Sequence, residues 1–407
     1  MDVKKRILVI DDEPMVLSAM KRVFRNNDEF EVETAVSGHE ALLKLQHGAF
    51  SVVVSDLRMP GMDGFQLLDE VARDFPQIVR IILSGETDND VITRFPGHAH
   101  QFLAKPADHS EITETLRRAI ALQALSAAHP GLGDIIAKAG SLPSLPALYH
   151  QIMQELQSPE CTPGRIGELI IQDIGMTTRL LQLVNSPFFG LSRTISDPVH
   201  AARLVGLDIL KGLIITSQAF SQFEGTKVSY LSISELTKHS MLAGRTATKI
   251  LQDNQGSRGE IDDAFTAGLL HDIGKLLLTR ILHDEYNEVI EQSREEKQVF
   301  WQKEQETLHA THAELGAYLL GLWRLPTVVV EAVARHHVPA GSSAGARRVV
   351  GAVHAADIMT YDTDGTGEQL PTGEVDSAYL AEVGVTVDFA ACKEFIAGIR
   401  NKAQASS

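Results

Sequence analysis

Short β-branched runs alternate with amphipathic segments over residues 6–122, and this alternation constrains the fold more than any other feature of the chain. The expected strands are RILVI (6–10), EVETA (31–35), SVVVS (51–55), VRIIL (79–83) and HQFLA (100–104). A helical pattern follows each strand, as in parallel βαβ units. The pattern therefore predicts a doubly wound, flavodoxin-like, five-stranded parallel sheet, whose ligands lie at the carboxyl ends of the strands.

The alternation stops near residue 135, after a break at AAHPGLGD. Long segments of 3.6-residue period follow, so the second part should be a larger all-helical domain. The fold class expected for the whole chain is therefore α/β plus all-α. The expected organisation is an N-terminal domain (4–122), a linker (123–134) and a helical domain (135–400), with lobes at about 135–223 and 230–360 and a C-terminal extension.

Polar residues follow four of the expected strands: Asp11 and Asp12, Asp56, Ser84 and Lys105. Each has a simple structural explanation by itself, such as a helix cap for Asp12 or a turn for Asp56. Together they would meet at one edge of a parallel sheet. Carboxylates there can bind Mg²⁺, and an aspartate can accept a phosphoryl group whose charge the metal and a lysine offset.

The motifs IDDEP, SDLRMPGMDG, LSGE and FLAKP make residues 4–122 resemble a response-regulator receiver domain. The resemblance implies a histidine kinase as partner and Asp56 as the phosphoacceptor. It also implies that Asp12, Asp56 and the carbonyl of Arg58 hold Mg²⁺, with Asp11 acting through water. The implied contacts of the phosphoryl group are Ser84 and Lys105, and Phe102 is the implied aromatic residue that repositions.

A second set of polar residues interrupts apolar helical stretches. His271 and Asp272 lie within GLLHDIGKLLL, and a buried pair of this kind needs either hydrogen-bonding partners or a metal. Glu235 and His239, four residues apart, share a helical face. Scattered histidines often have purely structural roles, so both interpretations stay open at this point. The remaining candidates are His312, His336, His337 and Asp357, and nitrogen and oxygen ligands of this kind suit zinc, manganese or iron.

Residues 135 to about 360 resemble an HDOD domain, a helical relative of the HD phosphohydrolases, through LPSLPALYHQI, TTRLLQLVNSPFFG, ARLVGLDILKGLI, GLLHDIGKLLL and LGLWRLPTVVVEAVARHH. The resemblance implies one or two transition metals at the histidines and aspartates named above, with Glu235 as a possible further ligand and Lys275 beside a bound phosphate. Many HDOD domains are regarded as non-catalytic output modules. The Gly-Tyr-Pro signature of the branch that cleaves cyclic di-GMP is absent, since Gly321-Leu322-Trp323 follows His312 instead.

Two functions follow from these features. The first is a response regulator whose helical module acts on an unidentified downstream protein, and the second is a metal-dependent phosphohydrolase gated by the N-terminal domain. A net charge of -16 argues against nucleic-acid binding. Cys161 and Cys392 form no Cys-x-x-Cys pair, and no apolar stretch is long enough to span a bilayer. We therefore expect a cytoplasmic protein without direct membrane insertion, and the sequence leaves homodimerisation open.

Overall fold

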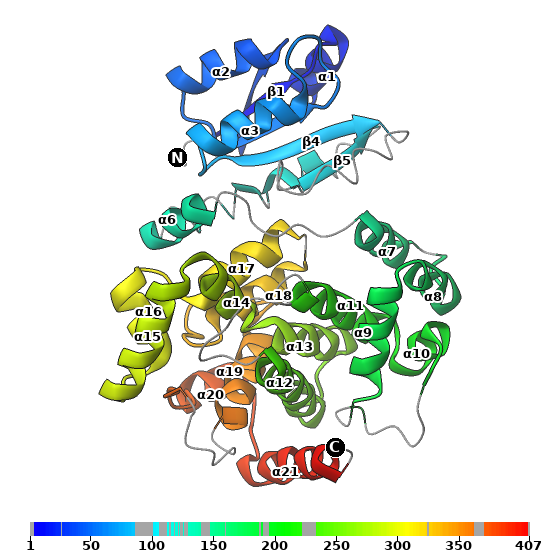
Figure 1. Cartoon of the computed structure of the whole chain (residues 1–407), viewed down its shortest axis with the longest axis vertical. Helices are drawn as coiled ribbons and strands as arrows, with labels where there is room; N and C mark the ends of the chain where they lie inside the picture. The colour runs from blue at the N-terminus through cyan, green and yellow to red at the C-terminus, as the bar shows by residue number, and fades with distance from the viewer. Residues whose placement is uncertain are drawn as a thin grey trace. The chain divides into compact units, whose positions relative to one another are not determined.

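The computed structural model describes residues 4–25, 27–85, 101–105, 147–158, 160–186, 195–221, 233–323, 325–361 and 370–405, with Phe189 and parts of 112–139. The chain divides into two compact units (Figure 1). The sheet unit comprises Met1–Pro146 and Tyr318–Arg324, and the helical unit comprises Ala147–Ala317 and Leu325–Ser407. Each unit is described by itself below.

The sheet unit contains a five-stranded parallel sheet in the order β2-β1-β3-β4-β5. This arrangement confirms the predicted class of fold, a small doubly wound parallel sheet at the N-terminus followed by helices. The elements are β1 (Lys5–Ile10), α1 (Pro14–Phe24), β2 (Phe30–Ala35), α2 (Gly38–His47), β3 (Val52–Asp56), α3 (Gly64–Asp74), β4 (Val79–Gly85), β5 (Gln101–Lys105) and α6 (Pro130–Ala139).

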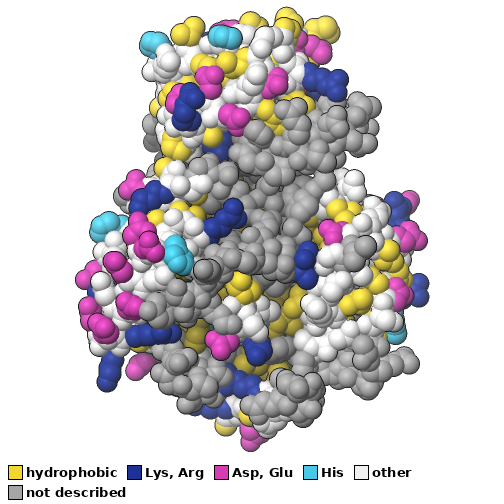
Figure 2. Space-filling view, in the orientation of Figure 1, with side chains coloured by type: hydrophobic (Ala, Val, Ile, Leu, Met, Phe, Trp, Pro, Cys, Tyr) yellow, Lys and Arg dark blue, Asp and Glu magenta, His cyan; other side chains and the backbone are white. Residues whose placement is uncertain are grey.

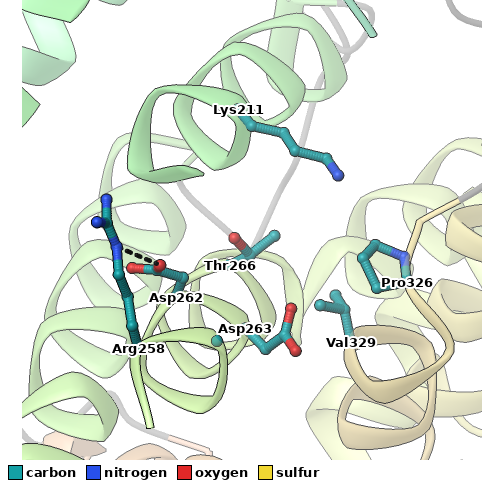
Figure 3. Close-up of a pocket in the computed structure, with 8 residues that line it drawn as sticks. Lys211, Arg258, Asp262, Asp263, Thr266, Pro326 and Val329 are labelled. Atoms are coloured by element: carbon teal, nitrogen blue, oxygen red, sulfur yellow. Dashed lines mark ion pairs between the residues drawn. The ribbon is translucent and has the colours of Figure 1, made fainter. Parts of the chain in front are cut away.

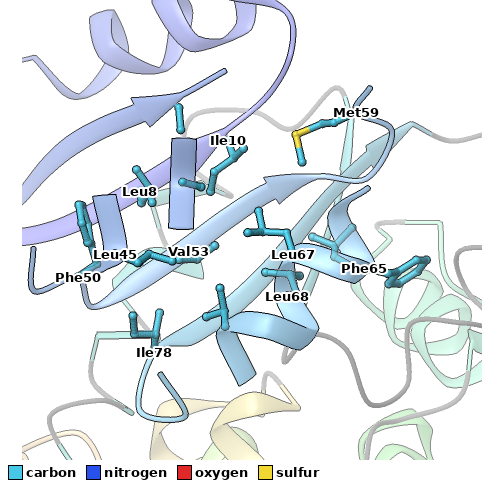
Figure 4. Close-up of a cluster of buried hydrophobic side chains, with 14 of the residues drawn as sticks. Leu8, Ile10, Leu45, Phe50, Val53, Met59, Phe65, Leu67, Leu68 and Ile78 are labelled. Atoms are coloured by element: carbon cyan, nitrogen blue, oxygen red, sulfur yellow. The ribbon is translucent and has the colours of Figure 1, made fainter. Parts of the chain in front are cut away.

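The alternation of side chains along each strand explains why helices cover both faces of this sheet. Leu8 and Ile10 of β1 belong to a buried cluster with residues of α2 and α3, including Leu45 and Leu67 (Figure 4). The intervening residues Ile7 and Val9 belong to a second cluster, which includes the apolar side of α1. The middle residues of the central strands are therefore apolar, while polar residues such as Lys5, Ser55 and Arg80 lie nearer the strand ends.

Segment 123–134, the expected linker, contains the first residues of helix α6, which begins at Pro130. Proline suits the first turn of a helix because it has no N–H to leave unpaired. The two compact units divide at Pro146 and Ala147.

The helical unit has α12, α13 and α19 packed together at its centre (Figure 1). Its helices are α7 (Ala147–Gln157), α8 (Pro163–Ile171), α9 (Ile174–Val184), α10 (Pro198–Val205), α11 (Leu207–Ser221), α12 (Ile233–Asp253), α13 (Arg258–Leu270), α14 (Ile273–Ile281), α15 (His283–Glu296), α16 (Phe300–Leu308), the first part of α17 (His312–Leu322), α18 (Thr327–Arg335), α19 (Arg347–Tyr361), α20 (Ser377–Glu382) and α21 (Phe389–Ala405). Among the described residues, none of these helices is both long and apolar enough to cross a membrane.

Acidic side chains are prominent on the flank of the helical unit that α15 and α16 form (Figure 2). The first turn of α15 carries Asp284 and Glu285, and its last residues include Glu295 and Glu296. This flank reflects the excess of acidic residues in the whole chain.

Candidate phosphoacceptor and metal sites

The ends of three strands bring two carboxylates and one lysine together in the sheet unit. Asp11 follows β1, Asp56 ends β3 and Lys105 ends β5. The Lys105 Nζ atom lies 2.7 Å from Asp11 Oδ2 and 2.5 Å from Asp56 Oδ1. Burial acts to lower the pKa of Lys105, but hydrogen bonds to Asp11 and Asp56 outweigh it and raise this pKa. The lysine therefore stays charged beside both carboxylates.

The backbone holds these carboxylates in place. Asp56 Oδ2 accepts a hydrogen bond from the N–H of Arg58 at 2.9 Å, and Asp11 Oδ1 accepts one from the N–H of Glu13 at 2.9 Å. Asp11 and Asp56 are 1% and 8% exposed, while Asp12 is exposed. Two converging carboxylates, with a third beside them at the surface, form an all-oxygen donor set that fits Mg²⁺.

Two of the predicted switch residues are placed only by their backbone. Ser84 lies in β4 and is paired in register with Ala104 of β5, and Phe102 lies in β5 beside Ile82. Their side chains lie outside the described part of the structure.

In the helical unit, five helix segments bring the predicted ligands to one buried place. The ligands are His239 in α12, His271 and Asp272 between α13 and α14, His312 at the start of α17, His336 and His337 after α18, and Asp357 in α19. Their potential ligand atoms form three overlapping groups: His239, His271 and Asp357; His271, Asp272 and His336; and His312, His336 and His337.

We call the first of these groups the α12 group and the last the α17 group. In the α12 group, His239 Nε2 lies 3.1 Å from His271 Nε2, and both atoms lie 3.2 Å from Asp357 Oδ1. In the α17 group, His312 Nε2 lies 2.9 Å from His337 Nε2. The α12 group thus offers two nitrogen atoms and one oxygen atom, and the α17 group offers three nitrogen atoms, at spacings that one metal ion could bridge.

Asp272 lies between the two groups. Its Oδ2 atom is 3.4 Å from His271 Nε2, and its Oδ1 atom is 3.2 Å from His312 Nε2. Although Asp272 is the N-cap residue of α14, its side chain makes no capping hydrogen bond. Neither carboxylate oxygen is therefore held by the backbone at the start of α14.

Hydrogen bonds at Nδ1 turn the Nε2 atoms of three histidines inward. His271 Nδ1 lies 2.8 Å from the carbonyl oxygen of Gly268, and His336 Nδ1 lies 2.7 Å from that of Val333. A carbonyl oxygen can only accept, so Nδ1 carries the proton and Nε2 keeps its lone pair whenever the ring is neutral. His312 has the same arrangement with a carboxylate as acceptor.

Two buried atoms of this cluster have no hydrogen-bond partner in the described residues, namely Asp272 Oδ1 and His336 Nε2. Unpaired buried polar atoms are rare because each one loses its hydration without compensation. A cation between these atoms would satisfy both. The residues present therefore fit a bound transition metal.

The charges of the cluster are strongly coupled. Burial acts to lower the pKa of His271, but the negative charges of Asp272 and Asp357 outweigh it and raise this pKa to about 10. Burial and the charge of His271 lower the pKa of His336 to about 3. These charges therefore favour a protonated ring at His271 and a neutral ring at His336.

Lys275, the predicted phosphate contact, is already paired. Its Nζ atom lies 2.7 Å from Asp272 Oδ2 and 2.8 Å from the hydroxyl of Tyr361. The Tyr361 ring also packs on His239, with the ring centroids 3.9 Å apart. Glu235 is exposed in the first turn of α12 and belongs to none of the three groups.

Two residues that sequence reasoning missed contact the cluster. Glu304 accepts a hydrogen bond from His312 Nδ1 at 2.6 Å and is fully buried. Tyr361 contacts Lys275 and Asp272. Glu304 lies in the polar segment FWQKEQETL, whose composition is typical of a solvated helix, so the sequence offered no signal for its burial.

A separate cavity of about 280 Å³ lies between α11, α13 and α18 (Figure 3). Arg258 and Asp262 form an ion pair at its edge, with an N–O distance of 3.7 Å. Lys211, Asp263, Thr266, Pro326 and Val329 complete the labelled lining. None of the metal-ligand candidates lines this cavity.

Comparison with known families matches both units. Residues 7–117 match the response regulator receiver domain, and residues 142–339 match the HDOD domain. The hydrogenase transcriptional regulatory protein HoxA of Cupriavidus necator is 36% identical over 126 residues, which are 30% of this chain and 26% of HoxA. The response regulator Rre1 of Synechocystis is 31% identical over 123 residues, which are 30% of this chain and 53% of Rre1. The chain thus spans less than two thirds of the length of these curated relatives.

A solved structure of similar fold is an HDOD domain protein of unknown function from Geobacter sulfurreducens. It matches with a TM-score of 0.58 and 24% identity, over 69% of this chain and 97% of that one. The chain therefore carries a response regulator receiver domain followed by an HDOD domain.

Proposed function

We propose that phosphorylation of Asp56 by a histidine kinase controls an HDOD output module that is built around a buried transition-metal centre and acts on a downstream protein. The observation that carries the metal centre is the pair of unpaired buried atoms, Asp272 Oδ1 and His336 Nε2, among the inward-facing histidines. The proposal places the protein in the cytoplasm, which suits two cysteines that are both free.

In the receiver, the Asp56 carboxylate would attack the phosphorus of a phosphohistidine, and the imidazole would leave as that bond breaks. Asp11, Asp12, Asp56 and the carbonyl of Arg58 would hold Mg²⁺, which offsets the charge of the phosphoryl oxygens. Lys105 now divides its charge between Asp11 and Asp56, and it would contact the phosphoryl group once Asp56 is esterified. Ser84 and Phe102 keep their proposed switch roles.

In the HDOD domain, His239, His271 and Asp357 would hold one metal ion, and His312, His336 and His337 a second, with Asp272 between them. Imidazole and carboxylate ligands favour iron, manganese or zinc. A catalytic metal site keeps an open position for water or substrate. Here His271, Asp272, His312 and His336 are at most 1% exposed. This burial favours a centre that stabilises and tunes the output module.

A second candidate function is metal-dependent phosphohydrolysis, which two observations favour. Two metals bridged by a carboxylate can activate water and clamp a phosphate, and Asp272 has the position of such a bridge. The side chains of His239 and His337 are 10% and 15% exposed, so substrate could approach from those two sides.

One set of measurements separates these functions. The full chain is incubated with acetyl phosphate and Mg²⁺, and the phosphoaspartate is detected by mass spectrometry in the wild type and in Asp56→Ala. Metal content is measured in parallel, followed by a hydrolysis screen over cyclic dinucleotides and phosphomonoesters. We expect an adduct that Asp56→Ala lacks, bound metal and no turnover.

The outcomes are distinct. An adduct that persists in Asp56→Ala would show that Asp56 is not the phosphoacceptor. Turnover that disappears in His271→Ala would establish the phosphohydrolase in place of the protein-binding output. If no metal is bound after loading with iron, manganese or zinc, the proposed metal centre is wrong, and the proposed receiver chemistry is unaffected.

A further inference from the structure

We infer that Glu304 is a positioning residue of the α17 group: a buried carboxylate that orients His312 and strengthens it as a metal ligand. This inference rests on the metal centre proposed above and deepens it. It concerns a residue that lies outside the three ligand groups and that reaches the metal only through a histidine.

Glu304 accepts three hydrogen bonds inside the helical unit. Its Oε2 atom lies 2.6 Å from His312 Nδ1 and 3.0 Å from the backbone N of His312. Its Oε1 atom lies 2.6 Å from the hydroxyl of Tyr286. Glu304 and Tyr286 are both 0% exposed. A carboxylate in such a place is costly to bury unless its oxygens are satisfied, and these three donors satisfy them.

The three donors show that Glu304 only accepts hydrogen bonds and that it holds His312 in one orientation. Burial raises the pKa of Tyr286 well above its usual value, so its hydroxyl keeps its proton and donates to Glu304. His312 is held at two points, through its backbone N–H and its Nδ1–H. The lone pair of Nε2 then faces Asp272 Oδ1 at 3.2 Å and His337 Nε2 at 2.9 Å.

The hydrogen bond at Nδ1 of His312 differs from those at Nδ1 of the other inward-facing histidines. His271 and His336 donate Nδ1–H to neutral backbone carbonyls, whereas His312 donates to a carboxylate. A carboxylate partner raises the basicity of a metal-bound imidazole more than a carbonyl does. Within the described residues, the α17 group alone has such a partner at Nδ1, so its affinity for metal should depend on Glu304 and that of the α12 group should not.

The test compares metal binding by the full chain with that of Glu304→Gln, which keeps the size of the side chain and removes its charge. Zn²⁺ and Co²⁺ are titrated against a competing chelator, and the Co²⁺ absorption spectrum reports the coordination of each group. Trp301 stacks on His337 with ring centroids 5.8 Å apart, so its fluorescence, quenched by Co²⁺, reports the α17 group. Glu306→Gln, on the exposed side of the same helix, is the matched control.

We expect Glu304→Gln to bind metal at the α17 group about 10- to 100-fold more weakly, with an altered Co²⁺ spectrum there, while the α12 group keeps its affinity. Tyr286→Phe removes one of the three donors and should weaken the same group by less than about tenfold. Glu306→Gln should match the wild type.

The inference and the proposed function can fail separately. If both groups of Glu304→Gln bind Co²⁺ with wild-type affinity and spectrum, Glu304 has no positioning role although the metal centre stands. If the wild type binds no metal, the proposed metal centre is wrong, and so is the inferred role of Glu304. Should Glu304→Gln not fold, Tyr286→Phe decides, because an unchanged α17 affinity in that variant also overturns the inference.

Discussion

Asp272 has two carboxylate oxygens that face different histidines, and this division explains why an aspartate directly follows His271. Its Oδ2 atom lies 3.4 Å from His271 Nε2, and its Oδ1 atom lies 3.2 Å from His312 Nε2. The unpaired state of Oδ1 is the feature that a metal would correct.

Asp272→Ala should therefore empty both groups, whereas His337→Ala should empty only the α17 group. We expect the metal content of Asp272→Ala to fall roughly tenfold or more and that of His337→Ala to fall to about half. The measurement is elemental analysis of each full-length variant after loading and desalting. His283→Ala, at the start of α15 and outside the three groups, is the control. Full metal content in Asp272→Ala would show that this aspartate is not shared.

How far the sequence predicts this site differs from residue to residue. The ligands of the α12 group are separated by up to 118 residues, so only the resemblance to a family could bring them together before the structure was known. Glu235 shares a helical face with His239, yet it lies one turn nearer the start of α12, where the helix is exposed. Glu304 was missed because burial by neighbouring helices, and not its local sequence, makes it functional.

At the scale of elements, the strands were predictable because every second residue of a buried parallel strand meets an apolar layer. Ile7 and Val9 face one layer, and Leu8 and Ile10 face the other. The ends of the helices depend on contacts with other helices, which the periodicity of the sequence does not reveal. Helix α14 is an example, since its second residue, Gly274, packs closely against another helix.

Gly274 in α14 lies so close to α17 that only glycine fits. An added Cβ atom would be 1.9 Å from the carbonyl oxygen of His312 and 2.9 Å from the N atom of Gly316. Gly274→Ala should therefore separate the two helices, lower the stability by about 1–3 kcal/mol and weaken metal binding at the α17 group. Calorimetry and metal titration of the full chain measure the two effects.

The matched control is Gly259→Ala in α13, where an added Cβ atom meets nothing within 4 Å. Alanine favours a helix over glycine by up to about 1 kcal/mol, so this variant should be as stable as the wild type or more stable. A wild-type metal affinity in Gly274→Ala would show that α14 and α17 can move apart without displacing His312.

The first turn of α13 carries a glutamate, Glu260, that forms an ion pair with α19. Ser257 and Glu260 form a capping box, and Glu260 Oε1 lies 3.0 Å from Arg348 Nη1. Burial acts to raise the pKa of Glu260, but hydrogen bonds from Ser257 and the charge of Arg348 outweigh it and lower this pKa. The folded state therefore favours the charged form, and the resulting stability is present above the unfolded pKa and lost as the pH falls through the folded one.

Glu260→Gln should lower the unfolding temperature at pH 7 by roughly 2–4 °C, which corresponds to about 1 kcal/mol. The difference from the wild type should shrink as the pH falls through the lowered pKa of Glu260 in the folded protein, where the wild-type carboxylate becomes protonated too. Thermal unfolding followed by circular dichroism between pH 7 and pH 3 measures it. Exposed Glu288→Gln on α15 is the control, and a difference independent of pH would exclude the charge as its cause.

For the whole molecule, the receiver and the HDOD domain each have a core and a candidate cation site of their own. A signal from Asp56 to the output requires a free energy of coupling between these sites, and such coupling is reciprocal. If a phosphoryl mimic at the receiver changes the affinity of the HDOD centre for metal, then metal at that centre must change the affinity of the receiver for that mimic by the same factor.

We expect the metal-loaded and metal-free full chains to bind beryllofluoride with Mg²⁺ at the receiver with affinities that differ about 5- to 150-fold, the usual range for coupled sites. Isothermal titration measures both affinities, and the difference should vanish in Asp272→Ala, because that variant cannot load its HDOD centre. Asp56→Ala should bind no beryllofluoride in either state. Equal affinities in the loaded and metal-free wild type would mean that the two sites act independently, and the HDOD metal would then stabilise the module without taking part in the signal.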